Sequence, residues 1–116
     1  MIFNKDIIIS IVILFITQII IWFQLNGQLK WDWFRDNYLL MSLLGVPISY
    51  ALLLSTKYAY DGFGGILWPG RLLGFAIGMI SFPFITWIVM GEGITLKSWI
   101  SIILAVIIMA LQLITI

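Results

Sequence analysis

Arg71 is the charged residue of this sequence that lies nearest to the interior of an apolar segment. Pro69 and Gly70 precede it, and Trp68 flanks them. Pro69 suits the first turn of a helix, because its missing N–H would have no partner there anyway. The free N–H groups and positive dipole of that helix end, together with the guanidinium, form a candidate anion site. The alternative is that Arg71 only extends its charge to the lipid headgroups.

Three polar or aromatic side chains inside apolar segments complete the candidate binding residues. Gln18 is the most central polar residue of the first segment, and its neutral amide could hydrogen-bond to another helix or face a ligand. Trp22 follows it on the same segment, and Tyr50 lies well inside the second. The predicted substrate-binding or lipid-binding residues are therefore Arg71, Trp68, Gln18, Trp22 and Tyr50.

Several kinds of chemistry are disfavoured by what the sequence lacks. It contains no cysteine and no histidine, which removes disulfides, thiol nucleophiles and the usual zinc or copper ligands. It shows no nucleophile–base pair, phosphate-binding loop or metal cluster, so we predict neither an enzyme nor a bound cofactor or metal. The net charge of +1 argues against a nucleic-acid partner, which would need a concentrated basic face.

The elements that must position these residues are four long apolar stretches, and nearly every charge lies between them. Hydrophobic residues make up 63% of the 116 positions and charged residues 9%. A soluble domain of this size could not cover so much apolar surface. In a bilayer, lipid covers it and each helix satisfies its own backbone groups. We therefore predict an all-α membrane protein: one domain over residues 1–116, with four transmembrane helices and both termini on the same side.

The predicted helices cover about residues 7–25, 38–57, 66–90 and 96–116. Tryptophans and tyrosines near the helix ends are typical of the two membrane interfaces. The start of the third helix leaves two alternatives. A start at Pro69 gives a helix about 33 Å long, whereas a start at Gly62 gives about 43 Å and requires a strong tilt or a break at Pro83. The choice decides how deep Arg71 lies in the membrane.

Small residues form a stripe on the third predicted helix. Gly70, Gly74 and Gly78 are spaced four apart and share one face, which lets another helix approach closely. Ser101 and Ala105 form a weaker version of this stripe on the fourth helix. We predict that both stripes are packing surfaces, either within the fold or between subunits.

The basic residues give no preferred orientation in the membrane. Three of them belong to the side of the termini and three to the other, so the usual excess of positive charge on one side is missing. Either the predicted loop boundaries are imperfect, or the chain inserts in both directions and pairs as an antiparallel dimer. The two groups are Lys5, Lys57 and Arg71 against Lys30, Arg35 and Lys97.

Short motifs accompany this layout. Residues 26–30 (Asn-Gly-Gln-Leu-Lys) close the first helix, and a Gly-Glu pair followed by Leu-Lys precedes the fourth. With four short helices in about 110 residues, the chain resembles small members of the drug/metabolite transporter superfamily. Gly62-x5-Trp68-x-Gly70 is similar to the third-helix motif of the small multidrug resistance proteins, and residues 90–113 resemble their final hairpin.

The chain departs from the small multidrug resistance proteins in two respects. It lacks the essential glutamate that they carry in the first helix, and their spacing from the tryptophan to the loop glycine is shorter. A related group of four-helix proteins is more similar in spacing, also lacks that acid and has a basic residue near the place of Arg71. The resemblance implies a homodimeric, transporter-like fold, and the missing acid argues against proton-driven export of cations.

Three functions compete at this point. We expect a transporter-like protein that binds or moves a small amphipathic or anionic molecule, or a lipid headgroup, in a cleft between helices. Its partners would be membrane lipids and a second copy of the chain, in a bacterial or phage-encoded inner membrane. The alternative is a non-transporting membrane subunit whose glycine stripe docks a larger complex. A third possibility is a small dual-topology ion channel of the fluoride type. It fits the size and charge balance, but the Asn-rich and Phe-Thr motifs of that family are not evident.

Overall fold

The computed structural model describes residues 4–114, and within them the chain is helical without a β-strand. Four segments are long and apolar enough to cross a membrane. This confirms the predicted all-α, four-helix membrane architecture. The elements are α1 (Lys5–Asn26), the 3-10 turn η1 (Gly27–Leu29), α2 (Asp32–Asp36), α3 (Tyr38–Leu43), α4 (Gly45–Gly62), α5 (Trp68–Met90) and α6 (Leu96–Leu113).

The observed boundaries settle the start of the third membrane helix. Gly62 ends α4, so the longer alternative that begins at Gly62 is wrong. Helix α5 begins at Trp68, two residues later than the predicted residue 66, and Pro69 lies in its first turn. The second helix reaches five residues beyond the predicted residue 57. The fourth ends at Leu113, and the predicted end at residue 116 lies outside the described residues.

A break near Leu44 divides the second membrane segment into α3 and α4. Pro47 lies in the first turn of α4. A proline has no N–H to donate to the carbonyl four residues earlier, which here belongs to Leu43, the last residue of α3. The chain therefore interrupts its helix one turn before Pro47. In contrast, α5 runs through Pro83 without a break.

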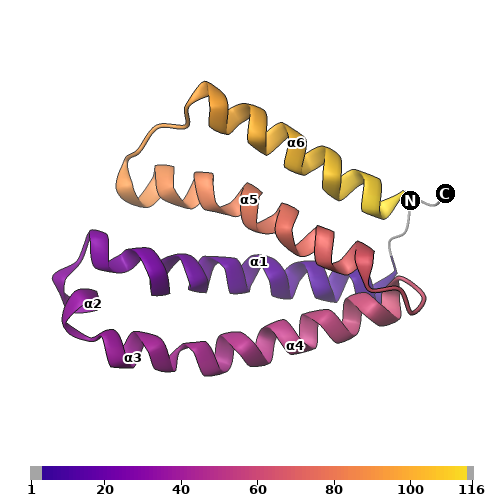
Figure 1. Cartoon of the computed structure of the whole chain (residues 1–116), viewed down its shortest axis with the longest axis horizontal. Helices are drawn as coiled ribbons and strands as arrows, with labels where there is room; N and C mark the ends of the chain where they lie inside the picture. Colours follow the sequence, from indigo (N-terminus) through magenta and orange to yellow (C-terminus); the bar gives the residue numbers. More distant parts are fainter. Residues whose placement is uncertain (1–3, 115–116) are drawn as a thin grey trace.

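The four long helices lie side by side in one thin layer (Figure 1). The Cα atoms extend over 48 × 35 × 18 Å. Helix α1 lies between α4 and α5, and α6 packs along the outer side of α5. The first residue of α1 and the last residue of α6 lie at the same end of the layer, as predicted for the termini (Figure 1).

Polar side chains join α1 to α4 within this layer. The Ser10 hydroxyl is buried, donates to the Ser55 carbonyl oxygen at 3.0 Å and lies 3.1 Å from the Ser55 hydroxyl. Asn4 caps α1 by accepting the Ile7 N–H, and its amide nitrogen donates to the Gly62 carbonyl oxygen at 2.7 Å. These bonds fix the start of α1 against the end of α4.

Two hydrogen bonds join the other end of α1 and the residue after η1 to the C-terminal part of α5. The Trp22 indole N–H donates to the Thr86 hydroxyl at 2.9 Å. The Lys30 ammonium donates to the Val89 carbonyl in the last turn of α5. A cation is favourable there, because the carbonyls that end a helix carry partial negative charge.

The buried core is small and most of the apolar surface faces outward. One cluster near the start of α1 joins all four long helices. Many large apolar side chains of each helix are exposed, including most of those on α6. In a bilayer this surface contacts lipid, so the exposure fits a membrane protein. The buried residues of the cluster are Ile7, Leu14, Ala59, Phe63, Leu73, Ile77 and Leu113.

Candidate binding groove

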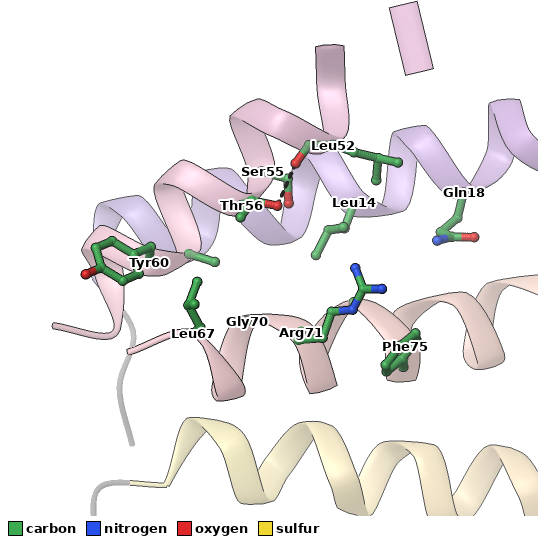
Figure 2. A pocket seen from close by; sticks show the side chains of 12 residues that line it. Leu14, Gln18, Leu52, Ser55, Thr56, Tyr60, Leu67, Gly70, Arg71 and Phe75 are labelled. Atoms are coloured by element: carbon green, nitrogen blue, oxygen red, sulfur yellow. Dashed lines mark hydrogen bonds between the residues drawn. The ribbon is translucent and has the colours of Figure 1, made fainter. Parts of the chain in front are cut away.

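A groove of about 450 Å³ lies between α4 and α5, with α1 as its floor (Figure 2). A volume of this order is typical of sites for single small molecules, which measure about 300–1,000 Å³. The lining residues are Leu14 and Gln18 of α1, Leu52, Ser55, Thr56, Ala59 and Tyr60 of α4, and Leu67, Gly70, Arg71, Gly74 and Phe75 of α5 and the turn before it.

The groove is narrow where α4 and α5 meet. A Cβ atom placed on Gly70 would lie 2.8 Å from the Ala59 Cβ, so the two helices touch here only because residue 70 has no side chain. The turn 63–67 connects them at this end, and Gly64 and Gly65 adopt φ angles of +74° and +83°. Such angles favour glycine. The turn and the Gly70 contact therefore close one end of the groove.

The rest of the glycine stripe faces α1 within the same chain. A Cβ on Gly74 would lie 3.8 Å from Leu14, and one on Gly78 would lie 3.3 Å from the Gln18 amide. On α6, Ala105 is fully buried, whereas Ser101 is exposed and donates its hydroxyl to the Lys97 carbonyl. The three glycines are half-buried: Gly70 packs against α4 and Gly78 against α1, while Gly70 and Gly74 also line the groove.

The Arg71 side chain points into the groove (Figure 2). Its guanidinium carbon lies 4.9 Å from the centre of the Phe75 ring, one helical turn further along α5. This cation–π contact orients the side chain without using its N–H donors. The ion pair found among residues 4–114 joins Arg35 to Asp32, so no carboxylate of that part of the chain neutralises Arg71.

The other polar groups of the groove carry no charge. The Thr56 hydroxyl donates to the Leu52 carbonyl of its own helix at 2.8 Å. The Ser55 hydroxyl is already hydrogen-bonded to the Ser10 hydroxyl. The Gln18 amide is half-buried and makes no hydrogen bond within the described part of the chain. An anion is the ligand that this arrangement favours, because the groove holds one free cation among apolar and neutral polar groups.

The structure brings together two of the five predicted binding residues. Arg71 and Gln18 both line the groove. Trp68 and Tyr50 are outside its lining and are 73% and 65% exposed. Trp22 is buried, and it lines a second cavity of about 70 Å³ on the other side of Gln18.

Sequence reasoning missed the contribution of α4 and the role of Phe75. Thr56 and Tyr60 are four residues apart and therefore share a face of α4, and the spacing from Arg71 to Phe75 is also four. Those spacings were the available signals. They show that two side chains share a helix face, but not which neighbouring helix that face meets.

Comparisons with known proteins identify no relative of this chain. No family model, no curated protein and no solved structure matches this chain. Among residues 4–114 there is also no group of three or more acidic, cysteine or histidine side chains that could hold a metal ion. The groove is therefore the feature of this chain that bears on its function.

Proposed function

We propose that this chain is a small transporter-like membrane protein that binds or moves an anionic, amphipathic molecule or a lipid headgroup. The ligand would lie in the groove between α1, α4 and α5. Its negative group would bind the Arg71 guanidinium, and its apolar part would contact the side chains beyond it. Arginine suits carboxylates and phosphates, because its planar fork can donate two parallel hydrogen bonds.

One observation carries the proposal: the guanidinium of Arg71 points into the groove and has no acidic partner in the described residues. If Arg71 only extended its charge to the lipid headgroups, a cavity beside it would not be expected. Charged groups in membrane helices that face a cavity usually mark a ligand pathway. The glycine stripe supports the same choice, because Gly70 packs against Ala59 and Gly78 against Gln18 within the same chain, which favours internal packing over docking of a larger complex.

We further propose that the chain forms a homodimer in an inner membrane. We also propose that it is related to the small drug/metabolite transporters. The observation in favour of an antiparallel pair is the even division of basic residues. The start of α1, the end of α4 and the start of α5 meet at one end of the layer (Figure 1). Three basic residues lie at this end, and the other three lie at the end where Lys30 meets α5.

The test measures retention of an anionic lipid by the purified protein. Wild type, Arg71→Lys and Arg71→Gln are reconstituted in nanodiscs that contain phosphatidylglycerol and phosphatidylcholine, and are then analysed by native mass spectrometry. Wild type should retain phosphatidylglycerol preferentially. Arg71→Lys should retain part of it, because the charge remains while the two-pronged geometry is lost. Arg71→Gln should lose the preference.

Lys57→Gln is the matched control. Lys57 lies at the same end of the layer and stacks on the Tyr58 ring, but it does not line the groove. Its removal should leave the lipid preference unchanged. Equal losses in Arg71→Gln and Lys57→Gln would show a general surface charge effect, and no loss in Arg71→Gln would contradict the proposal.

A further inference from the structure

The Gln18 amide is a second polar feature of the groove, and the anion site does not account for it. It lies in the middle of α1 and close to Gly78 of α5, and it shares the groove lining with the apolar side chains of Leu14 and Phe75. Residue 18 as a whole is half-buried, and its amide has no hydrogen-bond partner in residues 4–114. In the hydrocarbon region no bulk water supplies the missing bonds, so an unpaired amide is unfavourable there.

Gln18 lies at the opposite end of the groove from the turn. It faces Gly78, which follows Arg71 by seven residues on α5. At 1.5 Å of rise per residue, the two positions are about 10 Å apart along the helix. Between them the groove is apolar, lined by Leu14, Leu52 and Phe75. Figure 2 shows the guanidinium and the amide both projecting into the space between α1 and α5.

The spacing between Arg71 and Gln18 indicates which groups a ligand of the groove would carry and in what order. Its negative group lies at Arg71, near the closed end of the groove and the membrane surface. Its apolar chain runs toward the middle of the membrane, past Phe75. An uncharged group further along that chain, at most about 10 Å from the negative group, meets the Gln18 amide, which can donate and accept a hydrogen bond.

We infer that Gln18 determines specificity in the groove, and that the ligand is an anionic amphiphile with an uncharged hydrogen-bonding group in its chain. The inference rests on the proposed function, since it assumes that Arg71 holds the anion. It adds the substrate class and a second contact residue. A site built to hydrogen-bond such a group discriminates against the analogue that lacks it, because the protein amide is then left unpaired.

The test uses two probes that differ by one hydroxyl. One is octadecanoate, and the other is the same acid with a hydroxyl no more than about 10 Å from the carboxylate along the extended chain. Their dissociation constants are measured for wild type and Gln18→Leu in detergent micelles. Wild type should bind the hydroxy acid about tenfold more tightly, the effect of one well-placed hydrogen bond in a site of this kind. Gln18→Leu should bind both acids equally.

Gln112→Leu is the matched control for this preference. Gln112 is also a half-buried glutamine without a hydrogen-bond partner in the described residues, but it lies on α6 and does not line the groove. Its replacement should leave the tenfold preference intact. Thermal unfolding of each variant shows whether it is folded, and Gln18→Met replaces Gln18→Leu if the latter is not.

The outcomes separate the two proposals. If both acids bind in an Arg71-dependent way but wild type does not prefer the hydroxy acid, the role of Gln18 is refuted and the anion groove stands. The role of Gln18 is also refuted if the preference survives in Gln18→Leu. If Arg71→Gln binds both acids as tightly as wild type, the anion groove itself is wrong.

Discussion

The indole nitrogen of Trp22 and the hydroxyl oxygen of Thr86 lie 2.9 Å apart and join α1 to α5 through a hydrogen bond. Trp22 is only 3% exposed, so its N–H has no access to water as an alternative partner. The bond links the α1–α4 pair to the α5–α6 pair at the end opposite the groove. It also explains why Trp22 is unavailable to a ligand in the groove.

The first prediction concerns this bond. Thr86→Val leaves the buried indole N–H unpaired and should lower the free energy of unfolding by about 1–3 kcal/mol. Unfolding in mixed detergent and sodium dodecyl sulfate measures it. A double-mutant cycle with Trp22→Phe should give a coupling energy of roughly 0.6–2 kcal/mol. Strict additivity of the two substitutions would mean that the bond does not contribute to stability.

The second prediction compares two glycines of the same stripe. Gly70→Ala places a Cβ 2.8 Å from the Ala59 Cβ, which cannot move aside like the end of a long side chain. We expect a loss of about 1–3 kcal/mol in the free energy of unfolding. Gly74→Ala meets Leu14 at 3.8 Å, an ordinary contact, and should be neutral or stabilising by up to about 1 kcal/mol. Equal stability of the two variants would contradict the close approach of α4 and α5.

The third prediction separates two roles of Asn4. Its side chain caps α1 through the Ile7 N–H and also donates to the Gly62 carbonyl of α4. Asn4→Ala should cost about 2 kcal/mol of unfolding free energy, the sum of a cap and one hydrogen bond. Thr95→Ala removes the cap of α6 and an exposed bond to the Ser98 hydroxyl in the same turn, but no bond to another helix, and should cost about 1 kcal/mol.

Asn4→Ser tests the division between these roles. A serine can still cap α1 but has no amide nitrogen to donate to Gly62. Its stability should lie between those of wild type and Asn4→Ala. A serine variant as unstable as the alanine variant would show that the cap contributes little.

The fourth prediction concerns orientation in the membrane. With three basic residues at each end, reporters fused to the C-terminus should give signal on both sides of the membrane. Two added lysines in the segment between α5 and α6 should shift the population toward one orientation. A single orientation of the unmodified chain would exclude the antiparallel dimer and leave a parallel one possible.

The positions of the four membrane helices could be predicted because they depend on local composition. A run of about 20 apolar residues forms a helix in lipid whatever its neighbours are. The break at Leu44 does not follow from composition alone. A proline such as Pro47 has effects that depend on the turn before it, and Pro83 shows that a proline can also remain within a continuous helix.

The groove could be predicted only in part, because it depends on how the helices are rotated and spaced. Arg71 was identified because a charge within an apolar segment is unusual in itself. Trp22 and Gln18 are one turn apart on α1, yet one is buried against α5 and the other lines the groove. Only the placement of α5 against α1 decides between these roles. The same holds for Thr56 and Tyr60, which belong to the groove because α4 meets α5 at Gly70.

The position of α6 at the edge of the layer has a consequence for hydrogen–deuterium exchange. Helix α6 is supported along its length by α5, whereas α1 is supported on two sides. A segment with fewer neighbours opens at lower free energy, and its amides exchange earlier than those of the better-supported segments. In detergent, α6 should therefore lose protection first and α1 last. The groove, which α6 does not line, would remain assembled while its outermost helix opens and closes.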